Sequence, residues 1–207
     1  MTKNSSILFT IFASLFCFTT FFEPYSFSWL IKILPFIFLF SACYQHLKQD
    51  IPKLKIFIVG LIFCVGGDIF LALDRGGLFV FGLGSFLIGH LFYIAAMLPI
   101  EKKSVSFIAL IIVYGAAMFS LIQPGLDALF VPVAIYMFVL LTMTATTILT
   151  KSTNKWLIIG GVSFAVSDSL IGINKFYTPI PHSHVWIMIT YYLAQYSLTR
   201  GFLTRQF

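Results

Sequence analysis

Two aspartates lie inside apolar runs of this chain, one hundred positions apart. Asp68 lies in "VGGDIFLALDR" and Asp168 lies in "SFAVSDSLIGINK". A carboxyl group that is shielded from water and keeps its proton at neutral pH is a general acid, and a second, ionised carboxylate stabilises a cation or accepts a proton. The pair therefore predicts acid/base chemistry in a site enclosed by apolar segments.

Other polar side chains in apolar runs are candidates for the same site. An ionisable group costs about 2.5–3.5 kcal/mol at the centre of a membrane-spanning helix, so it usually faces a cavity or a partner. Beside the aspartates these groups are Lys32 and His90, and the uncharged ones are Tyr93, Tyr136, Ser167, Asn174, Tyr191, Tyr192 and Gln195. Structural alternatives exist: Lys32 can extend to the membrane interface, and His90 or either aspartate can be a partnered packing residue.

The composition is that of an integral membrane protein. Of 207 residues, 59% are hydrophobic and 10% are charged, and the mean hydropathy is +0.99. Stretches near 20 residues can cross ~30 Å of hydrocarbon as helices. Eight such stretches occur, at 5–22, 27–46, 55–73, 77–99, 104–123, 127–149, 155–174 and 183–203. With only short loops between them, the sequence predicts one all-α transmembrane domain over 1–207, without a visible binding site for a protein partner.

The distribution of basic residues predicts the orientation of the bundle. Ten of the 13 basic residues fall on one side of the predicted spans: Lys3, Lys48, Lys53, Lys55, Lys102, Lys103, Lys151, Lys155, Arg200 and Arg205. Because cytoplasmic loops are enriched in Lys and Arg, both termini are expected in the cytoplasm. The net charge of +6 is thus a topology signal and gives no reason to expect nucleic-acid binding. In a bacterium the membrane would be the plasma (inner) membrane.

The two aspartate segments indicate an internal repeat. Residues 59–75 align without a gap over 159–175, which matches Gly60 with Gly160, Asp68 with Asp168, and Arg75 with Lys175. Four helices plus four would give halves 1–103 and 104–207 in the same orientation, related by an axis along the membrane normal. The alternative is coincidence among apolar helices of similar composition.

Small residues predict close helix packing next to Asp168 and next to His90. In the 155–174 stretch one helical face carries Gly161, Ala165, Asp168 and Gly172. Such a stripe lets a neighbouring helix approach closely, and it directs Asp168 into the bundle. Ser85 and Gly89 form a similar pair next to His90.

Metal and cofactor sites receive little support from the sequence. "PIPHSH" supplies His182 and His184 but no third ligand at a fixed spacing, whereas Zn²⁺ needs three or four donors. The chain contains no GxSxG, HExxH, P-loop or dinucleotide-binding motif. The three cysteines show no CxxC spacing and are expected to be packing residues. We therefore expect no cofactor and no metal.

The ordered set of motifs resembles the YhhN/TMEM86 family, the lysoplasmalogenases. The resemblance rests on segments spread over nearly the whole chain: "WLIKILPF", "GGDIFLAL", "FGLGSFLIGHLFY", "VAIYMFVLLTM", "SFAVSDSLIGINKF" and "YYLAQYSLTRGF". The resemblance implies a membrane protein of about eight helices. It also implies hydrolysis of the vinyl ether bond of lysoplasmalogen, which releases a fatty aldehyde and a glycerophosphoethanolamine or glycerophosphocholine. At Lys32 this chain has Lys-Ile where the family often has Lys-Pro.

Vinyl ether hydrolysis suits paired carboxyl groups, because it begins with protonation at carbon and gives an oxocarbenium-like cation that water captures. We expect Asp68 and Asp168 to act as the acid/base pair, Lys32 to attract the lipid phosphate, and the polar residues named above to orient substrate or water. Two other functions remain open. Buried ionisable residues and parallel repeats also occur in small-solute or proton-coupled transporters, and His182 with His184 would suit a metal-dependent lipid hydrolase.

Overall fold

The chain is a bundle of long helices. The computed structural model describes residues 2–22, 27–49, 51–74, 76–101 and 104–205, and within these ranges it has eight α-helices and no β-strand. They are α1 (Lys3–Thr19), α2 (Ser28–His46), α3 (Leu54–Leu73), α4 (Phe79–Met97), α5 (Val105–Ile122), α6 (Phe130–Leu149), α7 (Lys155–Phe176) and α8 (Ser183–Leu203). Each corresponds to one predicted apolar stretch, so the prediction of an all-α protein is confirmed.

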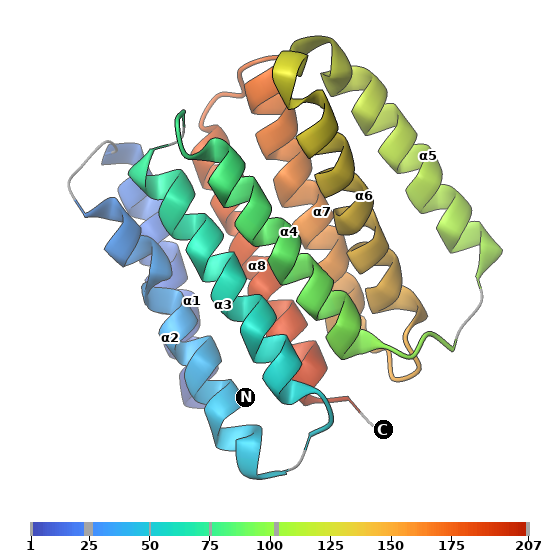
Figure 1. Cartoon of the computed structure of the whole chain (residues 1–207). Helices are drawn as coiled ribbons and strands as arrows, with labels where there is room; N and C mark the ends of the chain where they lie inside the picture. The colour runs from blue at the N-terminus through green and yellow to red at the C-terminus, as the bar shows by residue number, and fades with distance from the viewer. Residues whose placement is uncertain (1, 23–26, 50, 75, 102–103, 206–207) are drawn as a thin grey trace.

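Seven of the described helices, α1 to α7, are long and apolar enough to cross a membrane. The eighth predicted span, α8, is less apolar because it carries polar side chains. Five of these side chains are buried within the bundle: Tyr191, Tyr192, Gln195, Ser197 and Thr199. Figure 1 shows α8 running alongside the other helices, and it packs against α1, α2 and α7. Its polarity therefore lies toward the interior of the protein.

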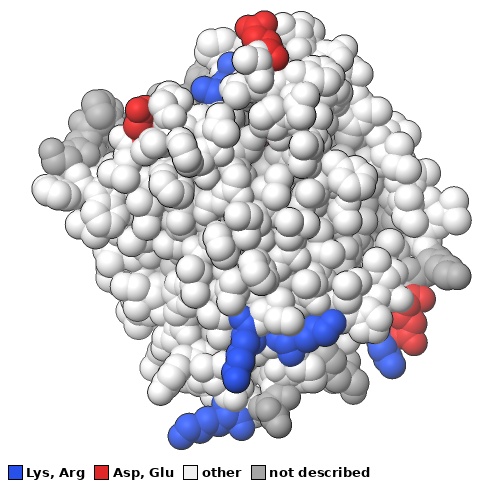
Figure 2. Space-filling view, in the orientation of Figure 1, with Lys and Arg blue, Asp and Glu red and all other residues white. Residues whose placement is uncertain are grey.

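Both termini lie at one end of the bundle, which we call the terminal end, and the opposite end is the distal end (Figure 1). Figure 2 shows Lys and Arg gathered near the terminal end of the visible face. Exposed basic residues of the described chain at this end are Lys3, Lys48, Lys53, Lys55, Lys151 and Lys155. Three basic residues used in the sequence analysis lie outside the described residues. They are Lys102 and Lys103, which belong to the charge count, and Arg75, which belongs to the repeat alignment. The orientation in the membrane remains a prediction.

Glycines bring neighbouring helices into close contact. Gly60 of α3 faces Gly89 of α4, and a Cβ atom placed on either one would come within 3.0 Å of the carbonyl oxygen of the other. On α7, a Cβ atom at Gly161 would collide with the side chain of Thr147 on α6. The hydroxyl group of Thr144 donates a hydrogen bond to the Gly161 carbonyl at 3.2 Å. The predicted close packing along small residues is confirmed at these positions.

The repeat remains a prediction after the helices are placed. The most extensive helix contacts are those of α3 with α4 and of α7 with α8, the pairs that the duplication would make equivalent. Gly60 faces Tyr93 on α4, and Gly160 faces Leu198 on α8. The matched aspartates nevertheless have different partners, as described below.

The last turn of α4 is held by basic residues from distant parts of the chain. Carbonyl groups at a helix C-terminus lack partners within the helix. The Lys53 ammonium donates to the carbonyl oxygen of Ala95 at 3.2 Å, and the Arg205 guanidinium donates to those of Ala96 and Met97, each at 3.2 Å. Positive charge at this position also interacts favourably with the helix dipole. The segment that follows α8 thus fixes the end of α4.

Replacing Arg205 with Ala should destabilise the bundle, because two buried carbonyl groups lose a charged donor, at a cost of about 1–3 kcal/mol. We expect a melting temperature several degrees lower in thermal unfolding of the purified protein in detergent. Lys151→Ala is the control, since Lys151 is an exposed basic residue at the same end. Equal melting temperatures for the two variants would contradict a role for Arg205 in holding α4.

Candidate active site

A buried ion pair joins α2 to α3. The Lys32 ammonium lies 2.9 Å from Oδ1 of Asp68, and the two side chains are 10% and 2% exposed. It is the one salt bridge among the residues that the structure describes. Each charge compensates the other at a depth where neither could remain alone without a large cost. The sequence had offered Lys32 as an interface residue or a phosphate ligand, and this partner was not foreseen.

Hydrogen bonds extend from the ion pair across two further helices. The hydroxyl group of Tyr191 on α8 donates to Oδ2 of Asp68 at 2.6 Å, and Gln195 donates from Nε2 to the Tyr191 hydroxyl oxygen at 3.2 Å. Tyr93 of α4 donates in turn to Oε1 of Gln195 at 2.8 Å. Four helices therefore fix the orientation of one carboxylate, and four of the predicted site residues join Asp68 in a single network.

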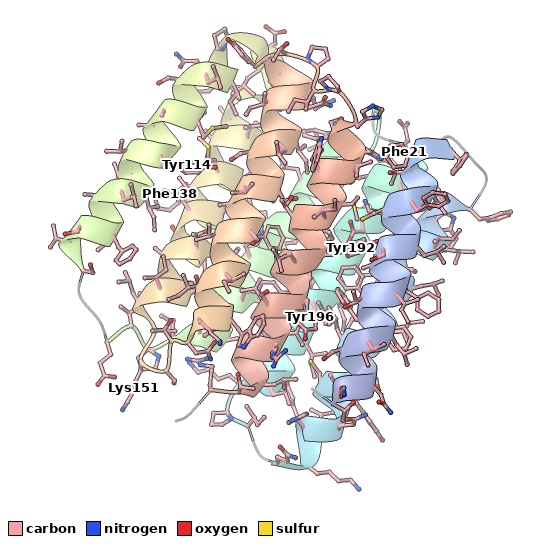
Figure 3. All side chains as sticks on the ribbon, turned by 180° about the vertical axis from the view of Figure 1, so that it is seen from behind. Phe21, Tyr114, Phe138, Lys151, Tyr192 and Tyr196 are labelled. Atoms are coloured by element: carbon pink, nitrogen blue, oxygen red, sulfur yellow. The ribbon has the colours of Figure 1, made fainter. Side chains whose placement is uncertain are left out.

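Tyr192, the next residue on α8, contacts the other member of the ion pair. Its hydroxyl group donates to the backbone carbonyl of Lys32 at 2.7 Å. Figure 3 shows Tyr192 directed toward α1, where its ring makes edge contacts with Phe9 and Phe16. Tyr192 thus holds the beginning of α2, and it contacts Lys32 without lining the cavity described below.

The second aspartate has a different environment. Asp168 of α7 accepts a hydrogen bond at Oδ2 from the hydroxyl group of Tyr136 on α6. In the part of the chain that the structure describes, no cationic side chain forms a salt bridge with it. Asp168 is partly exposed, whereas Asp68 is buried. The two carboxyl groups therefore differ in both charge partner and accessibility.

Both carboxyl groups face one cavity in the distal half of the bundle. Its empty volume is about 910 Å³, which includes the open space at its mouth. Its polar lining includes Lys32, Asp68, Asp168, Asn174, Lys175 and His184. An apolar pocket of about 650 Å³, counted in the same way, adjoins it and shares Asp168 as a lining residue. A polar chamber and an apolar chamber thus meet at Asp168.

His90 lies behind this surface. It is fully buried, and its ring packs against Phe164 and Tyr136 with ring centroids 4.5 and 5.6 Å away. Neither ring nitrogen has a hydrogen-bond partner among the described residues. His90 is not a lining residue of either chamber, so it contacts the site through Tyr136.

The end of α7 and the start of α8 supply further lining residues. The Asn174 side-chain oxygen accepts a hydrogen bond from the backbone N–H of Ile180 at 2.9 Å, which fixes the loop between these helices. Ser167 donates to the carbonyl oxygen of Ile187 at 3.1 Å. Lys175 and His184 line the cavity, and neither was predicted as a substrate ligand. Their positions next to Asn174 and at the start of the last helix were the available signal.

The described residues contain no arranged set of metal ligands. Among the described residues, no group of three or more His, Cys, Asp or Glu side chains is placed to hold a metal ion. His182 and His184, the pair in "PIPHSH", therefore lack a third ligand of these types within the described residues. Cys43 and Cys64 are buried with free thiols.

Comparison with known proteins assigns a family and relatives. The YhhN family matches residues 27–202, a range that includes every candidate site residue. The chain is 36% identical to a lysoplasmalogenase of Mycobacterium tuberculosis over 132 residues, which is 60% of this chain and 51% of the relative. It is 33% identical to lysoplasmalogenase TMEM86A of Homo sapiens over 183 residues, 81% of this chain and 75% of the relative. The chain spans about half the length of its mycobacterial relatives. No solved structure matches it.

Removing one member of the Lys32–Asp68 pair should destabilise the protein more than removing both. Lys32→Met and Asp68→Asn each leave the other group charged and unpaired, at a cost of about 3–5 kcal/mol. The double variant replaces the pair with two neutral groups, so we expect its melting temperature in detergent to return toward that of the wild type. If the melting temperature of the double variant falls by the sum of the decreases in the two single variants, the two charges do not compensate each other.

Proposed function

The chain belongs to the YhhN family, and from this premise we propose that it is a lysoplasmalogenase. In the proposed reaction, one water molecule hydrolyses the vinyl ether bond of an alkenyl-glycerophosphoethanolamine or alkenyl-glycerophosphocholine. The products are a fatty aldehyde and the glycerophospho-head group. The names of the mycobacterial and human relatives support this activity.

One observation carries the proposal: two carboxyl groups from α3 and α7 line the same cavity, and their environments differ. Asp68 faces the Lys32 ammonium and is assigned as the ionised carboxylate. Asp168 has a neutral partner, Tyr136, and is more accessible. We assign it as the proton donor. An acid and a fixed negative charge are the two groups that vinyl ether hydrolysis needs.

The proposed mechanism begins with proton transfer from Asp168 to the vinyl carbon that is not bonded to oxygen. The carbon–carbon π electrons form the new C–H bond, and the ether oxygen shares its lone pair to give an oxocarbenium ion. The Asp68 and Asp168 carboxylates stabilise this cation, much as carboxylates stabilise the related cation in glycosidases. Each carboxylate supplies a negative charge that stabilises the positive charge of the oxocarbenium ion.

Water then adds to the cationic carbon, and its proton returns to the Asp168 carboxylate. The hemiacetal breaks its bond to the glycerol oxygen, which receives the hydroxyl proton as the aldehyde forms. Atoms and protons balance, and both aspartates regain their initial states. In this mechanism Tyr136 and Tyr191 hold the two carboxyl groups in position through their hydroxyl groups.

The lipid head group would occupy the polar chamber. Lys32 and Lys175 line it, and an ammonium group attracts a phosphate as a point charge. Asn174 and His184 offer hydrogen-bonding groups beside them. Gln195 and Tyr93 belong to the buried network behind Tyr191, and we propose that they and Tyr192 position the site without direct contact with the lipid, as His90 does behind Tyr136.

The proposed setting is a multi-pass protein of the plasma membrane, or the inner membrane in a bacterium. The basic terminal end would face the cytoplasm under the positive-inside rule. The distal half, which contains the cavity, would then lie in the opposite leaflet. A single-chain lipid could enter this half laterally from the membrane.

Purified protein in detergent should release aldehyde from 1-alkenyl lysophosphatidylethanolamine and none from its 1-alkyl or 1-acyl analogue, as followed by mass spectrometry. Asp168→Asn and Asp68→Asn should each lower turnover about 10²–10⁴-fold, the usual contribution of a positioned acid or base. A chelator should have no effect.

Asp127→Asn is the matched control, because Asp127 is an exposed aspartate outside the cavity. Near-normal turnover in both folded Asp68→Asn and folded Asp168→Asn would overturn the mechanism. Absence of aldehyde with the wild-type protein would overturn the proposed activity, and Asp168-dependent solute uptake into liposomes would then favour a transporter. Loss of activity with the chelator, and in His182→Ala or His184→Ala, would favour a metal-dependent hydrolase.

A further inference from the structure

The apolar pocket beside Asp168 has the properties of a hydrocarbon site. It lies among α3, α4, α5, α6 and α7, and its lining is aliphatic and aromatic apart from Tyr136, Asp168 and Ser169. Methionines contribute from α5 and α6, at Met118 and Met137. Their unbranched, flexible side chains adapt to ligands of variable shape. Such a lining favours an extended apolar group and offers few partners to a polar one.

The pocket adjoins the polar cavity. The two share Leu71, Phe79, Phe86, Asp168 and Ile171 as lining residues. Lys32, Asp68, Lys175 and His184 line only the polar chamber, whereas Met118 and Met137 line only the apolar one. A ligand that occupied both chambers would therefore need a charged end, an apolar end and a junction next to Asp168.

We propose that the apolar pocket binds the unbranched hydrocarbon chain of a single-chain lysolipid, with the head group in the polar cavity. The inference rests on the proposed function and deepens it. A 1-alkenyl lysolipid changes from apolar to polar at its vinyl ether, and this orientation places that bond beside the carboxyl group shared by both chambers. Asp168 thus becomes the aspartate next to the reacting carbon, and Asp68 remains on the head-group side.

Gly172 keeps the pocket open. It lies one turn beyond Asp168 on the same face of α7 and lines the apolar pocket. A Cβ atom at this position would meet Ile122 of α5 at 3.6 Å, an ordinary contact, so a side chain can begin here without a clash. The remaining atoms of a larger side chain would occupy the space that we assign to the hydrocarbon chain.

Gly172→Leu should therefore weaken binding of a long-chain ligand more than binding of a short-chain ligand. The ligands are short- and long-chain 1-alkyl lysophosphatidylethanolamines, which are not hydrolysed under the proposed function, and binding is measured by thermal stabilisation of the purified protein in detergent. We expect the preference for the long chain to fall roughly tenfold, as when about two methylene groups are no longer buried. Gly172→Ala should have a smaller effect in the same direction.

Gly84→Leu is the matched control. It adds the same side chain to a helix glycine, but no atom lies within 4 Å of a Cβ atom at Gly84, and the residue lines neither chamber. It should keep the wild-type preference. An unchanged preference in folded Gly172→Leu would overturn the inference.

Photolabelling of the wild-type protein tests the location directly. A long-chain 1-alkyl lysophosphatidylethanolamine with a diazirine at the end of the chain should label α5 and α6, near Met118 and Met137. Labelling elsewhere, or equal labelling by a diacyl phospholipid probe, would overturn the inference. Neither measurement needs turnover. Labelling at the expected positions without aldehyde release would leave the chain site in place and refute the hydrolase, whereas aldehyde release with labelling elsewhere would refute the chain site alone.

Discussion

The Lys32–Asp68 ion pair is the interaction on which the arrangement of the site depends. Two opposite charges 2.9 Å apart can remain in the bundle only if they stay together and their other hydrogen-bonding positions are filled. Tyr191 fills one of these positions, and Gln195 and Tyr93 hold Tyr191 in turn. The need to satisfy one buried charge therefore connects α2, α3, α4 and α8, and it explains why Tyr191 and Gln195 of α8 lie in the interior.

The same fold gives its two aspartates unlike surroundings. Asp68 is surrounded by donors and is nearly inaccessible, while Asp168 has a single phenolic donor and lies where polar and apolar surfaces meet. This difference arises because α2 and α8 supply the partners of one carboxyl group, whereas α6 supplies the partner of the other. Two residues of one chemical type can thus take opposite roles in proton transfer without any difference in sequence motif.

Local sequence patterns were enough to predict the helices, because each helix is a continuous apolar run between short polar loops, and α8 was found despite its lower hydropathy. Patterns also singled out several of the polar residues that lie inside the bundle, among them Lys32, Asp68 and Gln195. They could not pair Lys32 with Asp68 or Tyr136 with Asp168, because such pairs depend on which helices become neighbours and how they are rotated. For the same reason His90 was expected to bind substrate but lies behind Tyr136, and Lys175 and His184 were not assigned to the cavity.

The ion pair joins two helices that are consecutive in the chain, which has a consequence for biogenesis. As the protein is synthesised, α2 and α3 emerge one after the other and can enter the lipid as a hairpin whose opposite charges neutralise each other. Tyr191, which completes the surroundings of Asp68, is made 123 residues later. The most costly groups can thus be inserted early as a neutral unit, and the cavity acquires its final form only when the last helix arrives.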